Sequence, residues 1–218
     1  MLVKTTFTIS LTIWLCLISL NIQASAVEEI IETTNEVAAT ANFLSDNEKK
    51  LSQCVVPKNT VNTQHELVDS TTNEDFKLLG QARFSVLFWD IYDSKLLTSD
   101  GEKPFSNVCQ YSLFEIHYLR DISKKELLDN TVAQWRHLAI KEAEYKAFVP
   151  VLADIWPDLK AGDRLSMLNQ VGMTDFYLNS KKIGEIKSLD FAKTFLRIWL
   201  DENTSEPKLR EQLLGDSI

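Results

Sequence analysis

The run LLGQARFSVLFWDIYDSKLL, residues 78–97, restricts the possible folds more than any other part of the chain. Its even-numbered and its odd-numbered positions are both mostly apolar, which predicts one long strand that is covered on both faces. Asp90 interrupts the even-numbered face, so we expect a bulge or bend at residues 89–91. A bulge of one residue would bring Arg83 and Tyr92 onto the same face of the strand.

A charged guanidinium inside this apolar run has two interpretations. In the first, the Arg83 side chain forms a structural ion pair or extends its head to water along a packed stem, and the candidate partners are Asp90, Asp93 and Glu115. In the second, Arg83 anchors a ligand carboxylate, because its planar fork donates two parallel hydrogen bonds. Tyr92 is likewise either a core aromatic with a satisfied hydroxyl or part of a ligand site. The residues leave these alternatives open.

The segment after this run predicts a second strand and a set of helices. Residues 110–120 alternate as a strand does, and Ser123 with Glu126 forms the capping box of a helix that we expect to continue to about Ala147. A short helix opened by Pro150 should follow, and then a turn at residues 160–163.

The last part of the chain predicts three short strands and two helices. The strands are expected at residues 164–170, 174–178 and 182–186, with a tight hairpin turn at Asn179 and Ser180. Helices capped by Ser188 and Ser205 should end the chain. Strands in succession, with helices grouped between and after them, predict an α+β domain with an antiparallel sheet.

The beginning of the chain has the features of a signal peptide. Lys4 precedes an apolar segment at residues 7–22, and Ala-Ser-Ala at residues 24–26 is a small-x-small cleavage site. We expect cleavage after Ala26 and a periplasmic or secreted protein. An uncleaved anchor is the alternative, but the apolar segment is shorter than the ~20 residues that span a bilayer. No stable membrane insertion is therefore expected after cleavage.

Composition divides the remaining chain and limits its partners. Residues 27–75 form an acidic segment followed by a polar linker, and residues 76–215 form the globular domain. The formal net charge of −8 disfavours nucleic acid and anionic lipid surfaces as partners. Cys54 and Cys109 are either a disulfide or two unpaired buried thiols. Since the three histidines are scattered and no metal-spaced cluster or haem motif occurs, we expect no metal and no cofactor.

Several segments together carry a resemblance to a known family. They are LLGQARFSVLFWDIYDSKL, DLKAGDRLSML, FYLNSKKIGEI and the closing FAKTFLRIWLDENTSEPKLREQLLG. They resemble the bacterial chalcone isomerase-like family over residues 76–215, nearly the whole expected domain. The resemblance implies an open-faced β-sandwich, in which a large antiparallel sheet is covered by a layer of helices and a ligand cleft lies between them.

The resemblance implies less about activity. Plant members of the superfamily close a chalcone to a flavanone and need a cation for the attacking phenolate. Arg83 is similar to their arginine in general location, and Asn130 could stand in for their asparagine. However, Leu87 stands where they have a threonine, and residues 123–126 lack the expected tyrosine. This pattern resembles the non-catalytic members, some of which bind a fatty acid by its carboxylate.

Three functions follow as hypotheses. The first is an exported, non-catalytic protein that binds a small apolar or amphipathic carboxylate, such as a fatty acid, with Arg83, Tyr92 and Asn130 as the ligand-binding residues. The second is an isomerase of the chalcone–flavanone type. The third is an envelope interaction module that docks an unnamed protein partner through its acidic residues 27–51.

Overall fold

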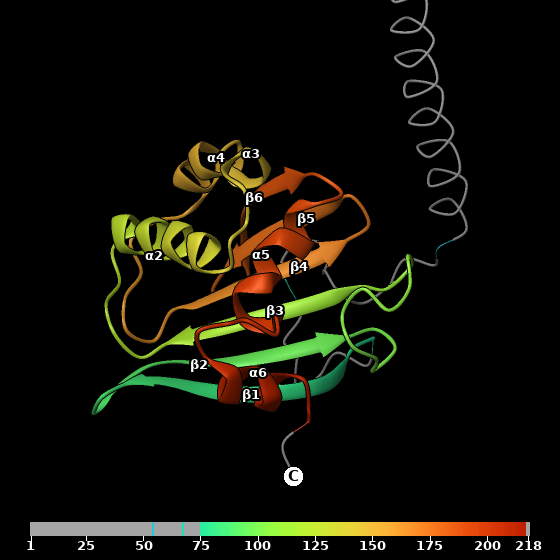
Figure 1. The fold of residues 1–218 in the computed structure, drawn as a ribbon, viewed down its shortest axis with the longest axis horizontal. Coiled ribbons are helices and arrows are strands. Elements are labelled where there is room, and N and C mark those ends of the chain that lie inside the picture. The colour runs from blue at the N-terminus through green and yellow to red at the C-terminus, as the bar shows by residue number, and fades with distance from the viewer. Residues whose placement is uncertain (1–53, 55–66, 68–74, 217–218) are drawn as a thin grey trace, which may run out of the picture. The chain divides into compact units, whose positions relative to one another are not determined.

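The described part of the chain is built on one antiparallel sheet. The computed structural model describes residues 54, 67 and 75–216. Six strands follow one another across the sheet in chain order (Figure 1): β1 (Lys77–Val86), β2 (Trp89–Thr98), β3 (Ser112–Tyr118), β4 (Arg164–Gln170), β5 (Met173–Leu178) and β6 (Lys181–Lys187). Each strand pairs only with its chain neighbours, so the sheet is a simple meander. The predicted α+β class and antiparallel sheet are confirmed.

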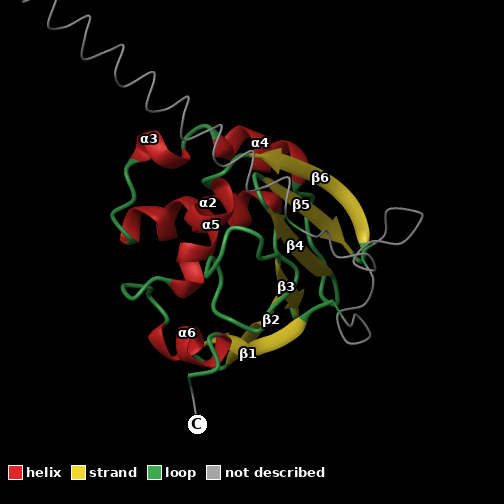
Figure 2. Cartoon of the chain, turned by 90° about the vertical axis from the view of Figure 1, so that its right-hand side faces the viewer, coloured by secondary structure: helices red, strands yellow, loops and turns green. Residues whose placement is uncertain are grey.

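Five helices of the described part form a layer on one face of this sheet (Figure 2). They are α2 (Lys124–His137), α3 (Glu142–Tyr145), α4 (Phe148–Ile155), α5 (Phe191–Leu200) and α6 (Pro207–Leu213). The main core lies between the two layers, where Phe114, Met167 and Phe176 of the sheet meet Trp135 and Phe195 of the helices. Burying side chains of this size is the main stabilising contribution.

The opposite face of the sheet carries a smaller core. Leu97, Leu113, Leu168 and Tyr177 are buried there together with Leu67 and Phe76. The backbone N–H of Leu67 donates to the carbonyl of Ser180 over 2.8 Å. The predicted signal peptide at residues 1–26 and the predicted docking segment at residues 27–51 lie outside the described residues, and the expected domain boundary at residue 76 stays a prediction.

The predicted long strand is wrong. Residues 78–97 form the hairpin of β1 and β2, which turns at Leu87 and Phe88 and is closed by the pair Val86 and Trp89. Most residues of β1 are exposed, because it is an edge strand. The expected bulge does occur, since Phe84 pairs with Tyr92 and the next residue of β1 pairs with Asp90, which leaves Ile91 as the extra residue.

The predicted helix start and the predicted hairpin turn are confirmed. The Ser123 hydroxyl and the Glu126 carboxylate bond each other's backbone N–H groups at the start of α2. Asn179 and Ser180, with φ of 50° and 72°, connect β5 and β6 as a tight turn. By contrast, α2 ends at His137 and not near Ala147, because Ala139 has a φ of 53° and leaves the helical region.

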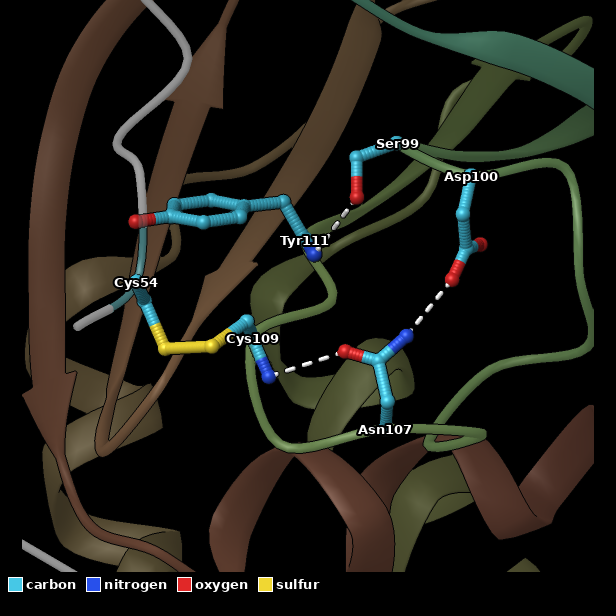
Figure 3. Close-up of a disulfide and its surroundings, with 6 residues drawn as sticks. All are labelled: Cys54, Ser99, Asp100, Asn107, Cys109 and Tyr111. Carbon is cyan, nitrogen blue, oxygen red and sulfur yellow. Dashed lines mark hydrogen bonds between the residues drawn. A yellow bond between two sulfur atoms is a disulfide. The ribbon is translucent and has the colours of Figure 1, made fainter. Parts of the chain in front are cut away.

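The loop between β2 and β3 is held by a disulfide and a hydrogen-bond network (Figure 3). Cys109 is joined to Cys54, 55 residues earlier in the chain. The Asn107 side chain accepts from the backbone N–H of Cys109 over 3.0 Å and donates to the Asp100 carboxylate over 2.7 Å. The pKa of Asp100 lies below its usual value because hydrogen bonds to its carboxylate outweigh the effect of burial. The two cysteines, for which the sequence left two alternatives, are thus bonded.

Helix α6 packs directly on the edge strand β1. A Cβ at Gly80 would lie 2.1 Å from the carbonyl oxygen of Gln212, so only glycine permits this approach. The contact places the segment before α6, with Ser205 and Glu206, beside the first strands of the sheet. No helix of the described residues is long and apolar enough to cross a bilayer.

Candidate ligand cavity

A cavity of about 390 Å³ lies between the sheet and the helix layer. Its apolar lining comes from β1, β2 and β3, from α2 and α5 and from the segment before α2: Phe84, Val86, Ile91, Ile116, Ile122, Ala133, Ile198 and Trp199. The volume falls in the range of roughly 300–1,000 Å³ that is typical of small-molecule sites. The apolar lining suits a hydrocarbon chain or ring.

The polar groups of this cavity are almost all uncharged. They belong to Tyr92, Tyr118, Asn130, Thr131, Gln134, Ser205 and Glu206. Glu206 is the one charged residue among the described residues that line the cavity, and none of them is Lys, Arg or His. A bound anion would therefore meet a carboxylate and no opposite charge, whereas a neutral hydrogen-bonding group would meet no such penalty.

Tyr92 reaches the cavity from β2 and is fixed by α5. The indole N–H of Trp199 donates to the Tyr92 hydroxyl oxygen over 2.9 Å. Burial raises the pKa of Tyr92 to about 12, the charge of Glu206 adds to this increase, and the hydrogen bond from Trp199 opposes it. At neutral pH the phenol keeps its proton. Because its oxygen already accepts from Trp199, that proton can be donated to a ligand.

Tyr118 lies at the end of β3, beside Tyr92. Its side chain is buried, and burial together with the nearby Tyr92 raises its pKa. The two rings make an edge contact with centroids 6.0 Å apart. The Tyr118 hydroxyl has no hydrogen-bond partner among the described residues. A donor without a protein partner at a cavity wall is a group that a ligand or a water can satisfy.

Helix α2 contributes a short polar row to the cavity. The Thr131 hydroxyl donates to the carbonyl of Leu127 in the preceding turn, and the Gln134 side chain accepts from the Ser205 hydroxyl over 3.1 Å. These two groups are thus partly occupied. The Asn130 amide is solvent-exposed and has no partner within residues 75–216, so it lies at an open side of the cavity.

Arg83 lies outside this cavity. Its Nε is 2.6 Å from Asp93 Oδ1 and its Nη1 is 2.9 Å from Asp90 Oδ2, and 54% of its side chain is exposed. Arg83 pairs with Asp93 in the hairpin, whereas Phe84 pairs with Tyr92, so Arg83 and Tyr92 are on opposite faces. The expectation that they share a face is wrong.

Arg83 also acts on its partner. The hydrogen bond from its guanidinium, together with its positive charge, lowers the pKa of the Asp93 carboxyl below the usual value. The ion-pair interpretation of Arg83 describes the structure. Of the three predicted ligand-binding residues, Tyr92 and Asn130 line one cavity and Arg83 does not, and their binding role stays a prediction.

Of the residues that line the cavity, only Tyr92 and Asn130 were predicted as site residues, and four of the others show what signal the sequence offered. The alternation of residues 110–120 placed Tyr118 on the same face as Ile116, and that signal could have identified it. Trp199 lies on the apolar face of α5, which the sequence marks only as a packing face, and its indole N–H also positions Tyr92. Gln134 and Glu206 have no sequence signal, because their place in the cavity depends on how α2 and α6 pack.

A second, smaller cavity of about 60 Å³ lies deeper in the core. Ile116, Tyr118, Thr131 and Trp199 line both cavities, so the small one borders the inner end of the larger one. The indole N–H of Trp156 on its wall has no partner among the described residues. The described part of the chain contains no group of three His, Cys, Asp or Glu side chains that could hold a metal ion.

Comparisons with known proteins identify a family and a protein of similar fold. A family model described as chalcone isomerase-like matches residues 57–215. The crystal structure of a fatty-acid binding protein from Arabidopsis thaliana resembles this chain with a TM-score of 0.53 at 10% sequence identity, over 69% of this chain and 96% of that one. At this identity the likeness shows a common fold. No curated protein matches the sequence.

Proposed function

The chain belongs to the chalcone isomerase-like family, and from this premise we propose that it is an exported, non-catalytic protein that binds a small apolar, fatty-acid-like molecule. The observation that carries the proposal is the cavity of about 390 Å³, whose apolar lining is combined with a few uncharged hydrogen-bonding groups. The structural likeness to a plant fatty-acid binding protein supports the same class of ligand.

The ligand's polar group is uncharged when bound. Tyr92 and Tyr118 present protonated phenols, Asn130 presents an amide, and Glu206 would repel a carboxylate. A fatty acid would therefore bind as the neutral acid, and an alcohol, ester or amide of similar length would bind equally well. This differs from a carboxylate held by Arg83, which is engaged by Asp90 and Asp93.

The chalcone-type isomerase is the less favoured alternative. Cyclisation of a chalcone needs a cation beside the attacking phenolate, and the described lining of the cavity includes none. Leu87, in the position where the enzymes have a threonine, is at the exposed turn of the hairpin. We expect no turnover of hydroxylated chalcones above the uncatalysed rate, followed by absorbance.

Export is proposed from two independent features. The first 26 residues have the features of a signal peptide, and disulfides such as Cys54–Cys109 persist in oxidising compartments. Fractionation of the source cells and mass spectrometry of the N-terminus should give a chain that begins at Val27 outside the cytoplasm. A chain with Met1 intact in the cytoplasm would contradict export.

Ligand binding is tested with two probes of equal chain length, dodecanol and dodecanoic acid. We expect both to bind, and we expect the affinity for the acid to fall as the pH rises through the pKa of its own carboxyl group, while that for dodecanol stays constant. Ala133→Trp, which places a large ring at the lining of the cavity, should abolish both. Ala143→Trp, on the exposed side of α3, is the matched control and should change neither.

The pH dependence of dodecanoic acid binding distinguishes a neutral head group from an ionised one. Tight binding of ionised dodecanoic acid, lost in Arg83→Ala, would restore the arginine anchor and refute the uncharged head group. The binding function itself is rejected under two conditions together. Neither probe binds, and the wild type and Ala133→Trp retain the same amount of any small molecule through purification.

A further inference from the structure

The turn of the β1–β2 hairpin exposes four consecutive apolar residues, which we call the hairpin tip. Val86, Leu87, Phe88 and Trp89 are exposed to 48%, 88%, 97% and 63%. In Figure 1 this turn forms the lower left end of the sheet. Single exposed apolar side chains are normal in soluble proteins, but a contiguous group of this kind marks an interaction site.

The fold does not require large apolar side chains at Leu87 and Phe88, the two central residues of the turn. Leu87 has a φ of 55°, a left-handed conformation that glycine or asparagine adopts more easily, and its side chain makes almost no contact. Phe88 is almost fully in water and buries nothing in the core. Neither packing nor turn geometry therefore explains the large apolar side chains at these two positions.

The hairpin tip borders the ligand cavity. Val86 before the turn and Ile91 after it both line the cavity, so the apolar surface continues from the tip into the site. A molecule that leaves an apolar phase at the tip could enter the cavity along a path of apolar side chains. The position thus fits the surface from which an apolar ligand is taken.

The surroundings of the hairpin tip fit a lipid bilayer. The guanidinium of Arg120 lies 5.3 Å from the ring centroid of Trp89, and tryptophan with arginine is typical of the membrane interface. Arg83 bonds both Asp90 and Asp93, and with Arg120 it supplies two positive charges against these two carboxylates, so the four formal charges behind the tip sum to zero. A convex tip enters a fluid lipid layer without needing a complementary pocket.

We propose that the hairpin tip inserts reversibly into the surface of a zwitterionic lipid bilayer, from which the cavity takes up its ligand. The net charge of −8 disfavours an anionic surface, so the attraction comes from burial of the apolar tip and not from charge. The uptake route rests on the proposed binding function, whereas docking to the bilayer does not depend on it.

The test measures binding of the exported chain, which we expect to begin at Val27, to phosphatidylcholine vesicles by co-flotation. Leu87→Asp with Phe88→Asp should lower the vesicle partition coefficient by at least about tenfold, since two apolar side chains lose their burial. Leu189→Asp changes a residue that is also exposed but lies near Gly172, at the opposite ends of the strands, and should change binding less than about twofold. All variants share the same residues 27–53, so differences between them report on the hairpin tip.

Two further measurements identify the inserted residue and the surface. Phosphatidylcholine with brominated acyl chains should quench part of the tryptophan fluorescence, and Trp89→Phe should remove that part. Wild-type binding should not weaken as salt is raised. Binding of dodecanol in solution should be unchanged in the aspartate variant, so that failure of the cavity and failure of the tip give different results.

Two results would overturn the proposal. The first is equal vesicle binding, with equal bromine quenching, by the wild type and the aspartate variant. The second is absence of vesicle binding together with a dimer in sedimentation velocity that the aspartate variant abolishes, which would assign the hairpin tip to a second copy of this chain.

Discussion

Tyr118 is the residue at which ligand binding and stability can be separated most cleanly. Its side chain is buried and its hydroxyl has no partner among the described residues, so Tyr118→Phe removes no hydrogen bond from the empty protein. We expect the free energy of unfolding to change by less than about 1 kcal/mol, or to rise. Dodecanol affinity should fall by about 5- to 10-fold, the effect of one neutral hydrogen bond. Urea unfolding and a binding titration measure the two quantities.

Tyr177→Phe is the matched control. Tyr177 is buried on the other face of the sheet, where its hydroxyl lies 3.5 Å from the Asp175 carboxylate. This change should leave dodecanol affinity as it is in the wild type. Unchanged affinity in Tyr118→Phe would show that the ligand does not bond to this hydroxyl.

At single residues, the sequence predicted which side chains line the cavity better than it predicted which face of the sheet a side chain lies on. Tyr92 and Asn130 were both predicted as ligand-binding residues and do line one cavity. Arg83 was considered with the correct partners, Asp90 and Asp93, but its face could not be predicted, because a turn and a bulge between it and Tyr92 each alter the alternation. Side-chain direction in a strand depends on every residue of the register.

Among the elements, the hairpin turn carries a conformation that its residues do not favour. Leu87 has a φ of 55° and is 88% exposed, so Leu87→Gly relieves the left-handed strain without loss of packing. We expect an increase in the free energy of unfolding of about 0.5–1 kcal/mol. Phe88→Gly, at a position without positive φ, should give no increase. A destabilised Leu87→Gly, in thermal or urea unfolding, would show that the leucine side chain supports the turn.

The two hairpins show what sequence can predict of an element. Asn179 and Ser180 favour left-handed turns, and that turn was predicted correctly. Leu87 and Phe88 carry no turn signal, and the apolar alternation continues through them. A two-residue turn between apolar strands is therefore not distinguishable from one longer strand by periodicity alone.

The disulfide fixes the β2–β3 loop to a residue 55 positions earlier in the chain. In the chain-entropy model, closing a loop of that length stabilises the folded state by about 4 kcal/mol. The double change Cys54→Ser and Cys109→Ser should therefore lower the free energy of unfolding by about 2–4 kcal/mol. Dodecanol affinity should stay the same, because neither cysteine is among the residues that line the cavity. A loss of dodecanol binding in a variant that is still folded would show that the disulfide and the cavity are coupled.

For the whole molecule, the α+β class and the order of elements after β2 were predicted from the residues, whereas the helix layer and a ligand cleft were implied only by the family resemblance. The residues that line the cavity could not be predicted. Local patterns identify strands, caps and helix faces, and antiparallel strands in succession leave few topologies. The cavity depends on how far α2, α5 and the segment before α6 stand from the sheet, which is set by packing between residues distant in sequence. Gln134 and Ser205, joined by a hydrogen bond across 71 residues, are an example.

The alkaline limit of stability is also a property of the whole fold. Burial raises the pKa of Tyr92 and of Tyr177 to about 12, and it raises that of Tyr118 as well. An unfolded tyrosine ionises near pH 10, so each group contributes stability that is fully present below about pH 10 and is lost as the pH rises through its folded pKa. For Tyr92 the loss amounts to about 2–3 kcal/mol. Urea unfolding midpoints should therefore fall steeply between about pH 10 and 12.

The variant with both Tyr92→Phe and Tyr118→Phe isolates the cavity's share of this dependence. It removes two of the four tyrosines whose pKa is raised by burial and leaves Tyr111 and Tyr177, so its unfolding midpoint should fall less steeply over the same range of pH. Absorbance titration of tyrosinate in the folded wild type should show these phenols ionising only together with unfolding. If the double variant retained the full slope, the alkaline transition would come from other groups, and the protonated state of the cavity's phenols would no longer be linked to the stability of the fold.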